Sequence, residues 1–170
     1  IRLPSGRTWT FQYDAHGGLE SIKTPAGTSH RFFIQPTFSS FVIHYTAPGA
    51  TQAYRQHFDT SARLKLTVFP ETTSKILYTH NTAGQLSSIV SGDGETNFSY
   101  GEDGLLSQVF NEERDLEYKI DFVYRGKMVQ ELRSEFSART GFSNMKFVYD
   151  YDPNNRLIKM SGRIGGQKVK

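Results

Sequence analysis

Apolar and polar side chains alternate along most of the chain, and this alternation predicts β-strands. The clearest stretch is residues 116–124, in which every second side chain is apolar and most of the others are charged. A period of two residues is typical of a strand with one buried face. The same period appears in residues 9–13 and 145–151. In residues 128–136 it places Met128, Leu132 and Phe136 on one face and Val129, Glu131, Arg133 and Glu135 on the other.

Short clusters of Gly, Pro, Asn and Asp separate these stretches and are typical of tight turns. The clusters are Thr24–Gly27, Ala47–Gly49, Ser91–Gly94 and Asp152–Asn155. Helical periodicity is scarce along the whole chain. We therefore predict an all-β fold, an array of antiparallel hairpins with one apolar face that forms a curved wall or, alternatively, a smaller closed or stacked form.

Three segments depart from the alternation. Residues 111–115 carry a run of charge, which favours a longer loop or one helical turn. Residues 137–141 are a second candidate for a longer loop, and residues 162–170 are expected to fray or to connect onward. Because the chain has 170 residues and no linker-like segment, we interpret residues 1–170 as one domain with a sizeable core.

A single hairpin pattern recurs six times in this sequence. Each copy has a residue that is usually aromatic, then usually Asp or Asn, two or three turn residues, a Gly or polar residue, and Leu. The positions that carry the pattern are Tyr13, Asp14, Gly17, Leu19, Phe58, Asp59, Leu64, Asn81, Gly84, Leu86, Tyr100, Gly104, Tyr124, Tyr151, Asp152 and Leu157. The first gap is about twice the others, which predicts a degenerate copy at His44–Gly49.

Each position of the pattern has a physical role. Aromatic side chains two residues apart line one face of a strand. Asp or Asn opens the turn, because its side chain accepts a hydrogen bond from the backbone two residues further on. Gly adopts a positive φ where the chain reverses, and Asn155 takes that place in the last copy. Leu begins the return strand beside the aromatic residue. The pattern thus predicts a structural unit rather than a catalytic motif.

Composition narrows the class of protein further. The net charge is +3 and the pI about 9.1, but basic and acidic residues are interspersed, which argues against a nucleic-acid surface. The basic residues of 156–170 are interpreted as a solvated strand face. The chain has no Cys, which a stacked repeat does not need, and no apolar run near the ~20 residues of a membrane helix. It opens in mid-pattern without a signal-like start, so we expect a piece of a longer protein.

Motifs for catalysis or metal binding are weak. The five histidines lack the spacing of a helical metal pair, and no Gly-x-Ser-x-Gly nucleophile motif is present. Gly162–Lys168 lacks the ending of a phosphate loop, and Gly92–Glu95 fits a hairpin turn better than a calcium loop. We predict no catalytic, cofactor-binding or metal-binding residue. A metal site built from histidines of adjacent repeats stays open, as does a carbohydrate or base-stacking platform on the aromatic rows. Asn97-Phe98-Ser99 makes Asn97 a candidate N-glycosylation site.

The repeated hairpin resembles the YD-repeat family, which is named for a Tyr-Asp pair kept here at Tyr13-Asp14 and Tyr151-Asp152. Within that family the chain is most similar to the teneurin branch, through Tyr45–Gly49, Ser91–Gly94 and Phe147–Met160. Bacterial toxin shells of the Rhs type share the repeat, but they usually keep Tyr-Asp and Gly-Arg-Leu more strictly than this chain does.

The resemblance implies a large hollow β-barrel shell of which this chain is a segment. It also implies a non-catalytic structural and interaction module on the extracellular side of the plasma membrane, in a single-pass cell-adhesion protein with EGF-like domains. The implied partners are a second copy of the protein, latrophilin-type adhesion receptors and neighbouring shell repeats. We expect no nucleic-acid partner and no cofactor, and we expect an isolated fragment to self-associate through its edge strands. A bacterial toxin-encapsulating shell fragment is the alternative, and a hydrolase or lectin on a repeat scaffold is a third hypothesis.

Overall fold

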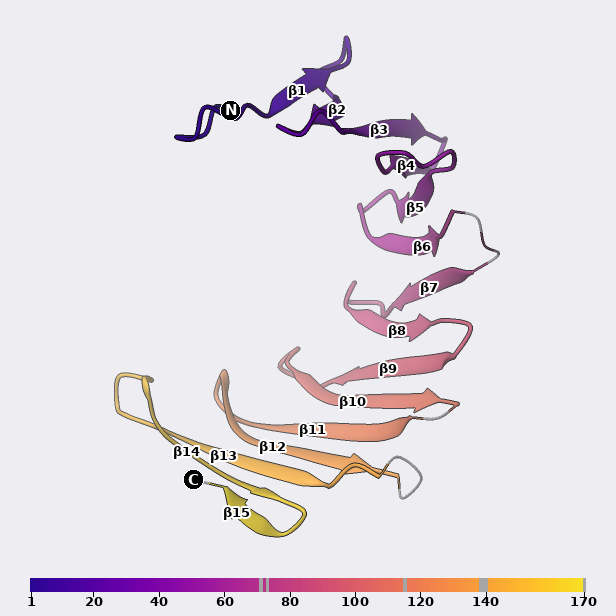
Figure 1. The fold of residues 1–170 in the computed structure, drawn as a ribbon. Helices are drawn as coiled ribbons and strands as arrows, with labels where there is room; N and C mark the ends of the chain where they lie inside the picture. The colour runs from indigo at the N-terminus through magenta and orange to yellow at the C-terminus, as the bar shows by residue number, and fades with distance from the viewer. Residues whose placement is uncertain (71, 73, 115, 138–140, 170) are drawn as a thin grey trace. The chain divides into compact units, whose positions relative to one another are not determined.

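The computed structural model describes residues 1–70, 72, 74–114, 116–137 and 141–169. Its regular elements are β-strands joined mostly by tight turns (Figure 1). The strands are β1 (Thr10–Tyr13), β2 (Leu19–Lys23), β3 (Ser29–Pro36), β4 (Ser40–Thr46), β5 (Tyr54–Asp59), β6 (Leu64–Val68), β7 (Lys75–His80), β8 (Leu86–Val90), β9 (Gly94–Tyr100), β10 (Leu106–Glu113), β11 (Glu117–Arg125), β12 (Met128–Phe136), β13 (Met145–Tyr151), β14 (Leu157–Ile164) and β15 (Gln167–Val169). The predicted all-β array of hairpins is confirmed. The described residues form no helix, and hence none that meets the length and hydropathy of a membrane span.

The chain divides into two compact units, Ile1–Tyr78 and Thr79–Lys170, which are described separately. In the first unit, β1 to β6 and the beginning of β7 are hydrogen-bonded in chain order. In the second unit, the end of β7 and β8 to β15 follow one another in the same way. Each unit is therefore a meander in which neighbours in sequence are neighbours in the sheet, as the colours of Figure 1 show. The interpretation of residues 1–170 as one domain stays a prediction.

Seven hairpin turns share one backbone geometry. The amide of the first turn residue donates to the carbonyl four residues on, and the amide of the fourth residue donates back to the first carbonyl. The fourth residue has a positive φ, from 57° to 84°. The first and fourth residues are Leu3 and Gly6, Asp14 and Gly17, Thr24 and Gly27, Asp59 and Ala62, Asn81 and Gly84, Gly101 and Gly104, and Asp152 and Asn155. This is a short hairpin loop closed by a residue in the left-handed conformation, and five of the seven lie where the repeat places a turn.

The repeat hairpins also shift register directly after the turn. Tyr13 pairs with Leu19, but Gln12 pairs with Ser21, so Glu20 is an extra residue on the return strand. The same shift follows the pairs Phe58 with Leu64, Tyr100 with Leu106, Tyr124 with Val129, and Tyr151 with Leu157. Such a β-bulge bends the return strand and moves its later side chains to the other face. The residues directly paired across the strands share a face, so each aromatic anchor lies beside its Leu or Val.

The β-bulge on β12 corrects one part of the predicted face assignment. Leu132 pairs with Phe122 and Val129 pairs with Tyr124, so Val129 lies on the aromatic face. Met128 pairs with Arg125 and lies on the opposite face. The prediction that placed Met128 with Leu132 was wrong for this end of the strand, because simple alternation does not count the extra residue.

The apolar face is only partly covered in the described chain, so the predicted sizeable core is wrong. Val42, with 7% of its surface exposed, is the one apolar side chain that is buried among the described residues. The remaining buried side chains are polar: Thr67, Ser88, Asn111 and Ser134. Large apolar side chains such as Tyr13, Phe33 and Met160 are exposed. Each unit is therefore a single layer of sheet, stabilised by cross-strand contacts and turns rather than by a closed interior.

Three further expectations are corrected. The degenerate copy between the first two is the hairpin β3–β4, whose turn is Thr37–Ser40. The turn at Ala47–Gly49 exists as predicted, but it joins β4 to β5. Residues 111–113 belong to β10 instead of a loop or helical turn, and the backbones of Glu113 and Leu116 bond to each other, at 3.1 and 3.3 Å. Asp115, the last residue of the predicted loop, lies outside the described residues. Residues 162–164 and 167–169 lie in β14 and β15, which contradicts the expected fraying, whereas an onward connection stays a prediction and Lys170 lies outside the described residues. Of the predicted loop at 137–141, residues 138–140 lie outside the described residues.

Ala62 offers a test of the turn geometry, because it is a non-glycine residue at a φ of 57°. A non-glycine residue in the left-handed region costs about 1–2 kcal/mol. Substitution by glycine removes this cost, but glycine also makes the unfolded chain more flexible, which offsets part of the gain in stability. We expect Ala62→Gly to raise the free energy of unfolding by about 0.5–1 kcal/mol in urea denaturation. The matched variant Gly84→Ala, at a φ of 82° in the next repeat turn, should lower it. A loss of stability in Ala62→Gly would contradict the assigned turn.

Candidate functional site

The aspartates of the repeat cap their own turns. The Oδ1 atom of Asp14 accepts hydrogen bonds from the amides of His16 and Gly18, at 2.9 and 2.8 Å. Asp59 and Asp152 accept the amides two and four residues further on in the same way, all at 2.9 Å. These bonds satisfy amides that the turn leaves without a strand partner. The carboxylates of the Tyr-Asp pattern are thus structural in each of the three turns.

The same hydrogen bonds explain the ionisation of these aspartates. The pKa of Asp14, Asp59 and Asp152 is lowered, and the largest cause in each is the bond from the backbone amide four residues on. Arg63 and Arg156 supply those amides in two turns, and each also brings its Nε atom to the free Oδ2 atom, at 2.8 and 2.7 Å. The polar residue before Leu therefore stabilises the turn a second time, through an ion pair with the capping aspartate. A carboxylate held ionised in this way does not serve as a general acid near neutral pH.

Two copies build the cap from other residues. Asn81 uses its Oδ1 atom to accept the amide of Gln85 at 2.9 Å. The fourth copy has Gly101 at the first position, and Asp103 accepts the amide of Leu105 at 3.1 Å. Although these two copies lack Asp at the first turn position, another side chain still accepts a hydrogen bond from a turn amide. The side chain of Gln85 also donates to the carbonyl of Gly104 at 2.7 Å, which links the turns of consecutive copies.

The tyrosine anchors join each hairpin to the one before it. The hydroxyl of Tyr100 donates to the carbonyl of Leu86 at 2.8 Å. Tyr124 donates to the carbonyl of Leu106 at 2.9 Å, and Tyr151 donates to the carbonyl of Val129 at 2.8 Å. In each case the acceptor is the Leu or Val position of the preceding copy. The bond therefore repeats from copy to copy along the second unit.

The register shift explains why these carbonyls accept a side chain. Leu106 lies beyond the first pair between β10 and β11, which is Gln108 with Asp121. Its carbonyl is therefore outside the ladder to β11, and the hydroxyl of Tyr124 reaches it from that strand. Sequence reasoning gave the anchors a packing role and missed this bond. The available signal was the choice of Tyr rather than Phe at positions 100, 124 and 151.

The apolar face of the first unit carries a row of ring contacts. Tyr45 stacks with His30 and with Tyr54, each at 5.9 Å between ring centroids, and Tyr54 meets Phe69 edge-on at 5.8 Å. A hollow of about 580 Å³ lies over this row and is lined mainly by apolar residues. Phe41 and Phe58, the anchor of the second copy, stack at 4.9 Å nearby. The row holds the strands together through offset and edge contacts.

The polar face of the second unit is a solvated network of charges. Glu131 accepts from Lys146 at 2.9 Å and forms a second ion pair with Arg133, and the bond from Lys146 is the largest cause of its lowered pKa. Lys119 pairs with Asp121 at 3.0 Å on the same face. Exposed pairs of this kind contribute little to stability, but they keep the face soluble. The basic residues Arg156, Lys159, Arg163 and Lys168 are exposed as well, which agrees with their interpretation as a solvated strand face.

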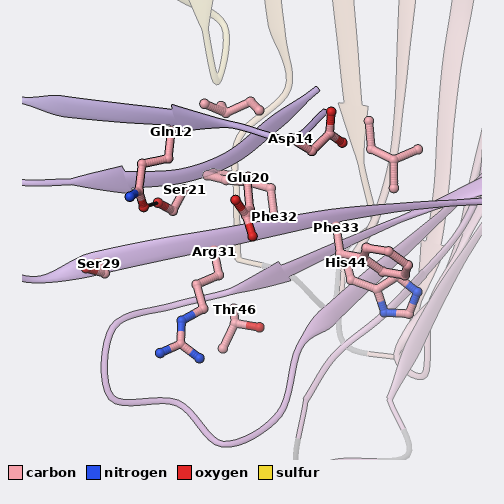
Figure 2. A pocket seen from close by; sticks show the side chains of 12 residues that line it. Gln12, Asp14, Glu20, Ser21, Ser29, Arg31, Phe32, Phe33, His44 and Thr46 are labelled. Atoms are coloured by element: carbon pink, nitrogen blue, oxygen red, sulfur yellow. Dashed lines mark hydrogen bonds between the residues drawn. The ribbon is translucent and has the colours of Figure 1, made fainter. Parts of the chain in front are cut away.

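The polar face of the first unit contains a second hollow, of about 710 Å³. It lies over β1 to β4, and Figure 2 shows the side chains that line it. Its lining residues are Gln12, Asp14, Leu19, Glu20, Ser21, Ser29, Arg31, Phe32, Phe33, Ile34, His44 and Thr46. The hollow combines an exposed aromatic ring with side chains that donate and accept hydrogen bonds.

The histidines have structural neighbours. His30 hydrogen-bonds to the hydroxyl of Tyr45 at 2.8 Å, and His44 to the side chain of Gln35 at 3.1 Å. The pKa of His57 is lowered, first by burial and then by the nearby charge of Arg55 and His44. Across the described ranges, no three His, Cys, Asp or Glu side chains are grouped so that they could hold a metal ion. The predicted hairpin turn is confirmed: Ser91–Gly94 join β8 to β9, and Glu95 already pairs with Val90 in the ladder.

Asn97, the candidate N-glycosylation site, lies in the middle of β9. It pairs with Ser88 of β8 and with Phe110 of β10, and it is half-buried. Ser99, whose hydroxyl completes the sequon, is exposed. Asn97 shares the polar face with the charged side chains of β11 and β12, because Phe110 pairs with Lys119 on that face. Modification of Asn97 stays a prediction.

The geometry described so far defines a structural β-hairpin repeat, in which the repeated polar groups cap turns and join hairpins. The sequence model of the family described as Teneurin YD-shell matches residues 1–170, and the chain belongs to this family. The teneurin branch of the predicted resemblance is thereby confirmed, and the chain is a teneurin-like shell segment.

Similar proteins with curated descriptions come from insects, birds and mammals. The chain is 25% identical over 170 residues to Teneurin-m of Drosophila melanogaster, with 99% of the chain covered. It is 26% identical to Teneurin-1 of Gallus gallus and 24% identical to Teneurin-3 of Mus musculus, each over 165 residues and 96% of the chain. The chain spans about 6% of the length of each of these relatives.

Removal of single hydroxyls tests the bond between hairpins. We expect Tyr124→Phe and Tyr151→Phe each to lower the free energy of unfolding by about 1 kcal/mol, because each leaves a half-buried carbonyl without its partner. The control is Tyr149→Phe on the same strand as Tyr151, whose hydroxyl bonds to no described residue and whose loss should be near neutral. Chemical denaturation of the purified chain measures all three. Equal effects at Tyr149 and Tyr151 would show that the bond does not stabilise the repeat.

Acid should weaken the turns through their aspartates. The lowered pKa of Asp14, Asp59 and Asp152 means that the folded state binds protons less readily than the unfolded state. Their contribution is therefore fully present above the ordinary value of 3.8 and is lost as the pH falls through the lower folded pKa. Thermal melts between pH 6 and pH 2 should show this loss. A triple Asp→Asn variant keeps the Oδ1 acceptors without a titrating group and should have a flatter profile. Identical profiles would contradict the assignment.

Proposed function

We propose that this chain is a non-catalytic structural and interaction module, a shell segment of an extracellular cell-adhesion protein. One observation carries the proposal: the repeated polar side chains are committed to turns and to hairpin–hairpin bonds. The carboxylates of Asp14, Asp59 and Asp152 cap backbone amides, and the hydroxyls of Tyr100, Tyr124 and Tyr151 bind backbone carbonyls. Such residues stabilise a rigid surface and do not assemble a reaction centre.

The partially covered sheet supports a place within a larger shell. The chain spans about 6% of its relatives, and most large apolar side chains on the aromatic face are half-buried or exposed. The edge strands β1 and β15 pair with neighbouring repeats of the full-length protein in this proposal. Membership of the Teneurin YD-shell family supports a position on the extracellular side of the plasma membrane. A second copy of the protein and a latrophilin-type receptor are the proposed partners.

Surface exposure and adhesion can be tested together in animal cells. The full-length protein would carry an epitope tag at the exposed turn Gly126–Lys127, between β11 and β12. We expect antibody staining of unpermeabilised cells, and aggregation of these cells with each other or with cells that display a latrophilin-type receptor. An Asn97→Gln variant would reveal, after N-glycosidase treatment, whether Asn97 carries a glycan.

The controls separate location from adhesion. Untransfected cells give the background of aggregation, and the Tyr149→Phe variant should behave as the wild type. Staining that requires permeabilisation would contradict the extracellular position. Aggregation at the background level in both pairings, with normal surface staining, would contradict the adhesion role alone.

A further inference from the structure

The polar hollow of the first unit has features that the shell does not require. It is about 710 Å³ in volume, within the range of about 300–1,000 Å³ of small-molecule sites. All of its lining residues lie between residues 12 and 46, so it is complete within the first unit. None of its side chains except those of Asp14 and Leu19 belongs to the repeat pattern. The hollow therefore calls for an explanation other than turn capping or hairpin pairing.

The ring of Phe33 is the first such feature. Phe33 lies on the polar face of β3, where it pairs with His44 of β4, whereas its neighbour Phe32 lies on the aromatic face and pairs with Tyr45. The side chain of Phe33 is 61% exposed. Its ring centroid is 5.6 Å from that of His44, with the ring planes tilted by 47° (Figure 2). The pair presents apolar ring surface at one side of a polar hollow.

The polar side chains of the hollow retain bonding capacity. Ser21 donates to the Oε1 atom of Gln12 at 2.6 Å, which leaves the amide group of Gln12 as a donor. Arg31 pairs with Ser21 in the ladder from β2 to β3, and its guanidinium bonds to no described residue. The carboxylate of Glu20, the extra residue of the β-bulge, also bonds to no described residue. Donors and acceptors therefore line the same concavity.

The charges of the hollow indicate which ligands fit it. Arg31 contributes one positive charge, and Asp14 and Glu20 contribute one negative charge each. This mixture does not attract a polyanion, because two carboxylates lie beside the one guanidinium. An uncharged ligand with several hydroxyl groups can instead donate to the carboxylate and accept from the guanidinium and the amide. A ligand of this kind that also has an apolar ring face can stack on Phe33.

We propose that this hollow binds an uncharged glycan, with one pyranose ring stacked on Phe33. The hydroxyls of the sugar accept hydrogen bonds from Arg31 and Gln12 and donate to Glu20. The proposal goes beyond the shell function, because it assigns to the first unit a ligand that neither folding nor hairpin stacking requires. It places recognition on β1 to β4, within the first unit.

The test is a glycan array probed with the full-length protein, followed by affinity measurements on the best oligosaccharide. The array carries uncharged glycans of hexose and N-acetylhexosamine in one arm, and sialylated and sulfated glycans in two others. We expect binding in the uncharged arm. Phe33→Ala should weaken the affinity about tenfold, because the stacked ring is removed. Arg31→Gln should weaken it as well, by removing the guanidinium that the hydroxyls contact.

Phe38 provides the matched control. It is fully exposed at the turn between β3 and β4, and it is not among the residues that line the hollow. Phe38→Ala should therefore leave the affinity unchanged, and melting temperatures would show that all variants are folded. Absence of binding in the uncharged arm would overturn the proposal, as would binding only of sialylated or sulfated glycans. Equal affinity of the wild type and the folded Phe33→Ala variant would overturn it too. None of these results would affect the test of surface exposure and adhesion.

Discussion

The hydrogen bond from a tyrosine hydroxyl to a backbone carbonyl of the preceding hairpin is the interaction on which the stacking of hairpins in the second unit depends. It follows from the β-bulge after the repeat turns. The bulge pairs the aromatic anchor with Leu or Val, and it moves that residue's carbonyl out of the ladder to the next hairpin. Tyr124 and Tyr151 then satisfy these carbonyls from the following copy. The β-bulge therefore has two effects: it places the aromatic anchor beside its Leu or Val, and it leaves a carbonyl that accepts the hydroxyl of the next copy. For this reason the geometry of the turn and the stacking of consecutive hairpins depend on each other.

A sheet built in this way does not need a thick core to hold its strands in register. The stabilising contacts join strands and copies that are neighbours in sequence. They are capped turns, cross-strand aromatic pairs and hydroxyl bonds between consecutive copies. Repeat proteins are stabilised by such nearest-neighbour contacts. The consequence is an apolar face that remains half-covered within this chain, with Val42 as its one buried apolar side chain in the described ranges. A segment with these properties is suited to a shell, in which neighbouring repeats continue the sheet on both sides.

The sequence was sufficient for the features that short segments encode. Asp152 and Asn155 lie in a turn because their own side chain and backbone preferences favour it, and both are visible in the sequence. The exchanged faces of Met128 and Val129 were not predictable from alternation, since the bulge depends on pairing with β11. The strand at 111–113 was missed for a related reason, because long-range pairing with β9 overrides the local run of charge. Alternation also shows which face is apolar without showing whether anything covers it, which is why the core was overestimated.

The side chains at the repeat positions are needed for folding, and this limits the positions at which a ligand can be recognised. A side chain that caps a turn or satisfies a carbonyl cannot change without a cost to folding, so specificity must come from positions outside the pattern. The β3–β4 hairpin is the unit with the most freedom of this kind. Its turn at Thr37–Ser40 is closed by Thr37 rather than by an Asp or Asn cap, and no aromatic–Leu anchor pair defines it. Phe33 and Arg31 lie on this hairpin and face the polar hollow together (Figure 2). The repeat that departs furthest from the shared design is therefore the one that presents an exposed ring and an uncommitted guanidinium, as expected for a surface adapted to bind a ligand.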